Sequence, residues 1–132
     1  MFGARKIAER PAPRRAIVAV GMGTAEGTAL LPKRVSDEVL ASGATLWVVS
    51  VQGAADASLT NRDTVWTRGT EASGGLRQNV VQATRLEASL LNVANSLLSQ
   101  YYLKMTRTRD GAMKPLKGTA QGSQVLFTRW VR

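Results

Sequence analysis

The sequence of 132 residues contains neither cysteine nor histidine. Without these residues the chain has no disulfide, no thiol nucleophile, no structural zinc site of the usual kind and no triad with an imidazole base. No apolar run approaches the roughly 20 residues that a membrane-spanning helix needs. These absences exclude most hydrolytic chemistry and predict that the chain has no membrane span.

Catalysis in such a chain needs another arrangement, such as a Ser–Lys pair or two carboxylates. No serine is followed by lysine at the third position after it, and the nine acidic residues are dispersed. The only adjacent acids, Asp37 and Glu38, fall on the expected exposed face of a helix. The sequence therefore predicts no catalytic residue and no cofactor.

Positive charge is in excess, with 18 Lys and Arg against 9 Asp and Glu and a net charge of +9. Such a charge can attract nucleic acid or an anionic surface. However, the chain has no RGG or RS tract, no interleaved aromatic residues and no helix-turn-helix or zinc pattern. We therefore favour solvated Lys and Arg side chains, with nucleic-acid or anionic-surface binding as the alternative.

Three segments follow from the patterning along the chain. Residues 1–15 hold two prolines and five basic residues, which predicts a flexible basic lead-in without the apolar segment of a secretory signal. Residues 16–100 predict an α/β domain, and residues 101–132 predict a C-terminal β extension. The sequence leaves the cellular compartment open.

The α/β domain begins with two apolar runs, Ala16–Val20 and Thr45–Val51, which lack polar alternation. Both are predicted to be strands buried on two faces. Between them Pro32–Ser42 is predicted to be a helix, because Pro32 suits its first turn and Gly43 suits its C-terminal cap. Strand, helix and strand in this order predict a right-handed parallel crossover.

Further elements follow in the second half of this domain. Asn61 is expected to cap a short helix that carries Val65 and Trp66 and ends before Ser73. Leu76–Val81 is a candidate for a brief third strand. A longer helix is predicted over residues 84–100 from an apolar stripe at helical spacing. The stripe consists of Leu86, Leu90, Val93, Ala94, Leu97 and Leu98.

The C-terminal extension has the pattern of strands. Tyr101–Thr108 is strand-like, and Asp110 with Gly111 signals a turn. Leu116–Ala120 and Gln124–Trp130 predict an antiparallel β-hairpin.

A glycine-rich segment after the first strand, GMGTAEG at residues 21–27, is a variant of the dinucleotide-binding fingerprint. Its context favours a flexible strand-to-helix turn, because Pro32 follows closely and no acidic residue ends the second strand at Val51. Nucleotide binding is the less favoured interpretation.

The order of these segments resembles the second half of bacterial von Willebrand factor A-like (vWA-like) domains of the VWFA-related type. The resemblance rests on RRAIVAV at residues 14–20, SGATLWVVSV at 42–51, RGTEASGG at 68–75 and LLSQYYLKMTR at 97–107. It implies a partial doubly wound, Rossmann-like parallel sheet that binds protein ligands, often through a divalent cation. The family's Asp-x-Ser-x-Ser motif has no counterpart here, and Met22 stands where the metal-facing Asp is expected.

A thioether cannot replace a carboxylate for a hard cation, so we expect no metal ligands. The resulting expectation is a non-enzymatic protein–protein interaction module, truncated or diverged from such a domain. Its missing strands would leave an open sheet edge, through which we expect it to bind a protein partner or to self-associate.

Overall fold

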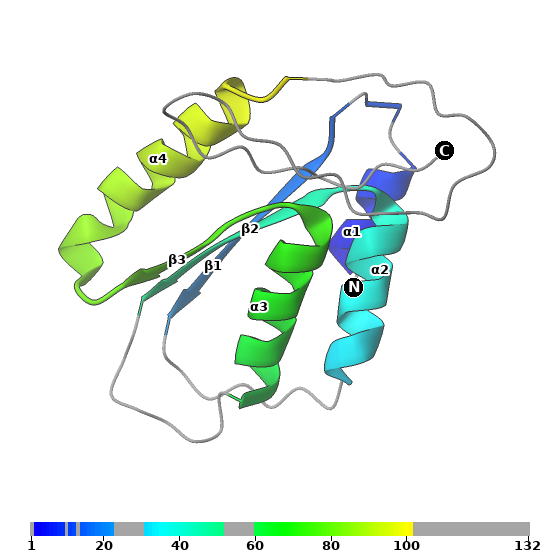
Figure 1. Cartoon of the computed structure of the whole chain (residues 1–132), viewed down its shortest axis with the longest axis horizontal. Helices are drawn as coiled ribbons and strands as arrows, with labels where there is room; N and C mark the ends of the chain where they lie inside the picture. Colours follow the sequence, from blue (N-terminus) through cyan, green and yellow to red (C-terminus); the bar gives the residue numbers. More distant parts are fainter. Residues whose placement is uncertain (1, 10, 13, 23–30, 52–59, 102–132) are drawn as a thin grey trace, which may run out of the picture.

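The computed structural model describes residues 2–9, 11–12, 14–22, 31–51 and 60–101 (Figure 1). These residues form a mixed α/β fold in which helices and parallel strands alternate. In chain order the elements are α1 (Phe2–Ala8), β1 (Ala16–Met22), α2 (Pro32–Ser42), β2 (Thr45–Val51), α3 (Thr60–Ser73), β3 (Arg77–Val80), the 3-10 turn η2 (Ala83–Arg85) and α4 (Leu86–Leu98). None of the described helices is both long enough and apolar enough to cross a membrane.

The sheet has three parallel strands in the order β1-β2-β3, with Ala16 paired to Thr45 and Val48 paired to Arg77. The three predicted strands and their parallel connection are therefore confirmed. The central strand β2 is buried on both faces, as expected. For β1 the same expectation is wrong, because β1 is an edge strand whose residues alternate between exposed and half-buried.

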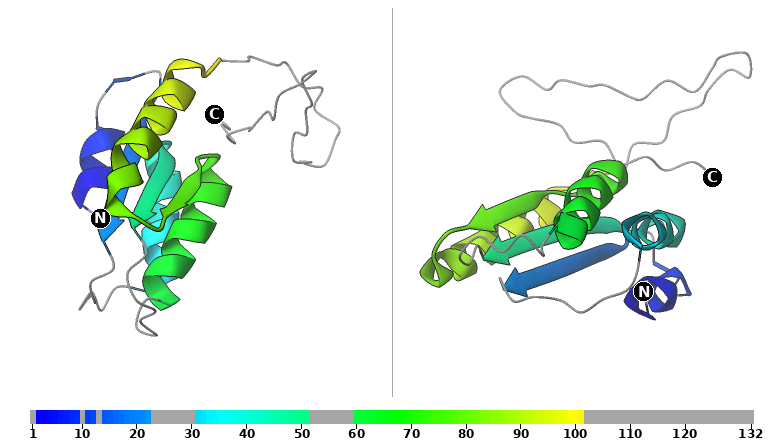
Figure 2. Two further views of the ribbon diagram at one scale, coloured as in Figure 1. Left: turned by 90° about the vertical axis from the view of Figure 1, so that its left-hand side faces the viewer. Right: turned by 90° about the horizontal axis from the view of Figure 1, so that it is seen from below.

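Helices lie on both faces of the sheet, as the left view of Figure 2 shows. On one face, Leu46 and Val48 of β2 pack with Val39 of α2 and Trp66 of α3. On the other face, the core consists of Trp47, Val49, Val80 and Val93, with Leu86, Leu90 and Leu97 of α4 packed against it. The side chains of β2 thus alternate between two separate cores.

Helix α2 has the predicted bounds, and its ends have the predicted chemistry. Pro32 occupies the first turn, and Gly43 adopts the left-handed conformation at φ 66° with its N–H bonded to the Leu40 carbonyl. Helix α3 differs, because it spans 14 residues from Thr60 to Ser73 and Asn61 lies inside it. The Ser73 hydroxyl accepts a hydrogen bond from Leu46 N, which fixes the end of α3 against β2.

At the N-terminus the structure differs from the predicted lead-in. Residues Phe2–Ala8 form α1, in which Ala4 is buried, and Arg5 Nη2 lies 2.9 Å from Glu38 Oε1 of α2. A helix of seven residues is marginal alone, so its contacts with α2 explain why it forms. The predicted C-terminal β extension and hairpin at residues 101–132 lie outside the described residues, apart from Tyr101.

The long helix predicted over residues 84–100 is confirmed, although its first turn is the 3-10 turn η2 and α4 ends at Leu98. Val93 is buried, and Leu86, Leu90 and Leu97 pack against the same core. Two members of the predicted stripe do not reach the sheet, since Ala94 and Leu98 are exposed. The stripe that contacts the sheet is therefore narrower than the sequence predicts.

Candidate interaction surface

One edge of the sheet is formed by the whole length of β1. In the described part of the chain, β1 pairs only with β2, from Ala16 to Met22. The Met22 carbonyl at the end of β1 accepts a hydrogen bond from Arg62 Nη1, and the described residues provide no strand partner for the other outward N–H and C=O groups of β1. The opposite edge is formed by β3, which has only four residues, three of them polar. Charged and short edge strands discourage pairing, so β1 is the more accessible of the two edges.

The side chains of β1 make this edge apolar on one face. Val18, Val20 and Met22 are paired in register with Trp47, Val49 and Val51, so they share the α4 face of the sheet. Their exposed fractions are 44%, 49% and 57%, whereas Trp47 and Val49 are almost fully buried. The cause is the position of α4, which packs on β2 and β3. We call these three side chains the uncovered β1 face.

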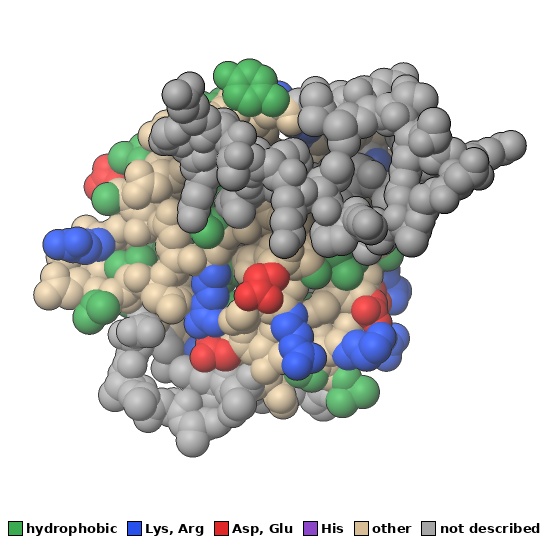
Figure 3. Space-filling view, in the orientation of Figure 1, with side chains coloured by type: hydrophobic (Ala, Val, Ile, Leu, Met, Phe, Trp, Pro, Cys, Tyr) green, Lys and Arg blue, Asp and Glu red, His purple; other side chains and the backbone are tan. Residues whose placement is uncertain are grey.

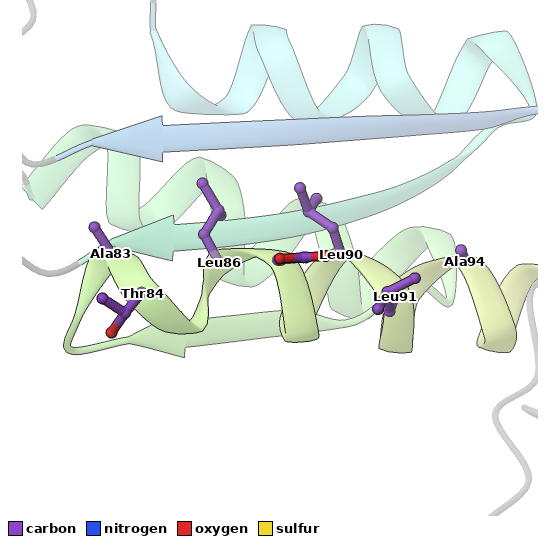
Figure 4. A pocket seen from close by; sticks show the side chains of 7 residues that line it. Ala83, Thr84, Leu86, Leu90, Leu91 and Ala94 are labelled. Atoms are coloured by element: carbon purple, nitrogen blue, oxygen red, sulfur yellow. The ribbon is translucent and has the colours of Figure 1, made fainter.

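A shallow apolar hollow of about 690 Å³ runs along α4. In the close view, Leu86 and Leu90 point from α4 toward the sheet, whereas Leu91 points away from it (Figure 4). Leu91 is 57% exposed, and Ala94 lines the hollow beside it. The hollow is lined by Ala83, Thr84, Leu86, Glu87, Leu90, Leu91 and Ala94. The α4 face of the sheet therefore exposes apolar side chains on both the strand and the helix.

The structure gives the first glycine of the glycine-rich segment a packing role. A Cβ atom on Gly21 would overlap the Trp66 ring of α3, with Cζ2 at 2.6 Å. Gly21 therefore allows the indole to lie directly against the backbone of β1. This contact explains one glycine of the dinucleotide-like pattern without a nucleotide, while residues 23–27 lie outside the described residues.

Two basic side chains lie over the Trp66 ring. The Arg62 and Arg77 guanidinium carbons lie 4.7 and 5.5 Å from the ring centroid, in the range of cation–π contacts. Arg77 also forms an ion pair with Asp63 at 2.7 Å. This cluster joins α3 to β3, so its cations have partners within the protein.

Other described basic residues are also engaged within the fold. Lys33 pairs with Asp37 at 2.7 Å, and Arg5 pairs with Glu38. Arg15 donates to the Ser42 carbonyl. Figure 3 shows Lys and Arg side chains interspersed with Asp and Glu on the face in view. The two adjacent acids of the sequence are thus both ion-paired, Asp37 within α2 and Glu38 with Arg5 of α1.

The described residues offer no set of ligands for a divalent cation. Met22, which the resemblance places at the position of a metal-facing Asp, ends β1 with an exposed thioether. Among the described residues, no group of three or more carboxylates could hold a metal ion. A hard cation needs several oxygen ligands, and a thioether supplies none.

We therefore expect Mg²⁺ and Mn²⁺ to produce no saturable binding heat when they are titrated into the full chain. Isothermal titration calorimetry at millimolar cation measures this directly, with the buffer titration as its control. A saturable site of micromolar affinity would contradict the assignment and would restore an adhesion-type metal mechanism.

Comparison of the chain with protein-family models, with curated proteins and with solved structures finds no match. The assignment of a function accordingly rests on the residues and the fold alone.

Proposed function

We propose that the chain is a non-enzymatic protein-interaction module that takes up an extended polypeptide segment along β1. The supporting observation is that β1 has no strand partner on its outer side within the described residues, together with the exposed apolar side chains of Val18, Val20 and Met22. In this proposal the chain resembles a truncated or diverged VWFA-related domain without a metal ion-dependent adhesion site.

Strand addition uses both properties of this edge. The main-chain groups of the free edge supply hydrogen bonds to an added strand, and alternate side chains of that strand enter adjacent apolar surface. An added strand beside β1 extends the α4 face of the sheet, where its side chains cover Val18 and Val20. Burial of such apolar surface contributes roughly 25 cal/mol per Å².

A second protein or a second copy of this chain provides such a strand. The net charge of +9 opposes self-association through repulsion between copies. At an ionic strength of about 0.15 M, screening limits this repulsion to a range of roughly 8 Å. The contact between apolar edges acts at shorter distances than this, so added salt favours it.

We expect the full chain to self-associate with a strength that increases from low salt to physiological salt, and Val20→Lys to weaken the association at least about tenfold. A lysine on an edge strand places a charge where the added strand must pack. The matched control is Val81→Lys, which adds the same charge at a residue 74% exposed beyond β3. Sedimentation equilibrium over a dilution series measures all three proteins.

Equal association of the two lysine variants would show that β1 is not the contact. Far-ultraviolet circular dichroism verifies that each variant remains folded. The salt series also separates this function from the alternative, because binding to nucleic acid weakens steeply as salt rises.

A further inference from the structure

The free edge of β1 and the end of the described chain lie close together. Arg14 Nη1 donates a hydrogen bond of 2.8 Å to the Gln100 carbonyl, across 86 residues of sequence. Arg14 lies two residues before β1, whose first residue Ala16 is paired with Thr45. The chain therefore leaves α4 beside the end of the sheet at which β1 begins, as the upper part of Figure 1 shows.

A strand that starts there can run parallel to β1. Residues 102–108 have the sequence YLKMTRT, in which tyrosine and threonine favour strands. Their number equals the seven residues of β1. Leu103 and Met105 alternate with Lys104 and Thr106, the pattern of a strand with one apolar face.

The position of α4 supports the same placement independently. Helices α2 and α3 lie on one face of the sheet, and the chain moves with them from β1 to β2 and then to β3. Connections between parallel strands are right-handed in about 98% of cases. With α4 on the opposite face, a right-handed connection from β3 leads back across the sheet toward the β1 edge.

We propose that residues 102–108 of the same chain form a fourth parallel strand on β1. This strand then occupies the outer edge of β1, to which a partner strand would bind. The inference rests on the proposed function, because it makes the segment a built-in competitor of any partner strand. A tethered segment has an effective concentration of the order of mM, so a free strand of similar affinity displaces it only at comparable concentrations.

Cysteine cross-linking tests this occupant in the full chain, which has no native cysteine. The hydrogen bond of the Arg14 side chain to the Gln100 carbonyl does not fix a register, and we take its offset of 86 residues, which places Thr106 beside Val20, as the starting point. Val20→Cys is combined in turn with a single cysteine at each of positions 104 to 108, which allows for a shift of register. Neighbouring strands lie about 4.8 Å apart, and a disulfide spans Cα distances of about 4.4 to 6.8 Å.

We expect at least one of these pairs to form a disulfide within a single chain in most molecules after mild oxidation, as measured by mass spectrometry of peptides. The matched control replaces Val20→Cys with Val81→Cys, beyond the opposite edge, and no cross-link above background is expected there. Cross-linking no greater than in the control would overturn the proposal. Cross-links only between two chains would also overturn it and would make a second copy the occupant.

A proline pair separates this inference from the proposed function. Consecutive strand residues direct their N–H groups to opposite sides, so Lys104→Pro with Met105→Pro removes a hydrogen bond to β1 in either register. We expect this variant to associate about tenfold more tightly than the control Ala112→Pro with Met113→Pro. Equal association of the two variants would contradict a competing strand.

The cross-linking result and the association of Val20→Lys together show which of the two proposals fails. An intrachain cross-link together with unchanged association in Val20→Lys supports the fourth strand and refutes the proposed function. Weakened association in Val20→Lys without any intrachain cross-link refutes the fourth strand and supports β1 as the contact of the proposed function.

Discussion

Gly75→Ala is expected to destabilise the fold by about 3 kcal/mol or more, because overpacking against the backbone cannot be relieved by a rotamer change. A Cβ atom at this position would overlap the Leu46 carbonyl oxygen and lie 2.5 Å from its carbonyl carbon. Leu46 belongs to the central strand, so relief requires a shift of β2 or of the turn after α3. Urea denaturation followed by circular dichroism measures the loss.

Gly3→Ala is the control for this substitution, since outside its chain neighbours and its own helix backbone no atom lies within 4 Å of the added Cβ. Alanine is favoured over glycine within a helix, so this variant is expected to be neutral or more stable by up to about 1 kcal/mol. A loss below about 1 kcal/mol for Gly75→Ala would show that the contact between the α3 turn and β2 is looser than the structure indicates.

Leu90→Ala and Leu97→Ala are each expected to cost about 2 to 3 kcal/mol, because each leaves a cavity between α4 and the sheet. Both leucines are half-buried and pack on the core around Trp47 and Val93. Leu98→Ala is the control, since this side chain is 83% exposed and its loss should change stability by less than about 0.5 kcal/mol. The same denaturation experiment measures all three variants. A cost similar to that of the control for both Leu90→Ala and Leu97→Ala would contradict the packing of α4.

Local chemistry explains which elements the sequence predicts well. Helix α2 has both a proline at its start and a glycine at its C-terminal cap, and these residues act on their immediate neighbours. Strand β2 is an unbroken apolar run, and it occupies the central position where such a run is buried on both faces. Such signals need no knowledge of the rest of the fold.

The candidate site could not be predicted in the same way. Ala16–Val20 has the composition of a central strand, yet its burial depends on where α4 crosses the sheet, about 70 residues later. Val18, Val20 and Met22 are exposed only because α4 packs on β2 and β3. The unusual feature of β1 is thus an apolar face on an edge strand, which only the strand order reveals.

Two further differences have the same origin in contacts between distant residues. Helix α1 forms through its packing on α2, including the ion pair between Arg5 and Glu38. Gly21 belongs to a motif that suggests phosphate binding, but its lack of a side chain accommodates Trp66 from α3. In each case the partner is 30 residues or more away in the sequence, beyond the reach of local patterns.

Amide hydrogen exchange in the full chain, followed residue by residue by NMR, tests most directly whether the β1 edge accepts a strand. We predict that the amides of Ala16–Met22 that are not bonded to β2 exchange slowly, whereas those on the free side of β3 exchange quickly. The lysine variant of Val20 should accelerate exchange along β1 alone. Equally rapid exchange at both edges of the wild-type sheet would contradict the account.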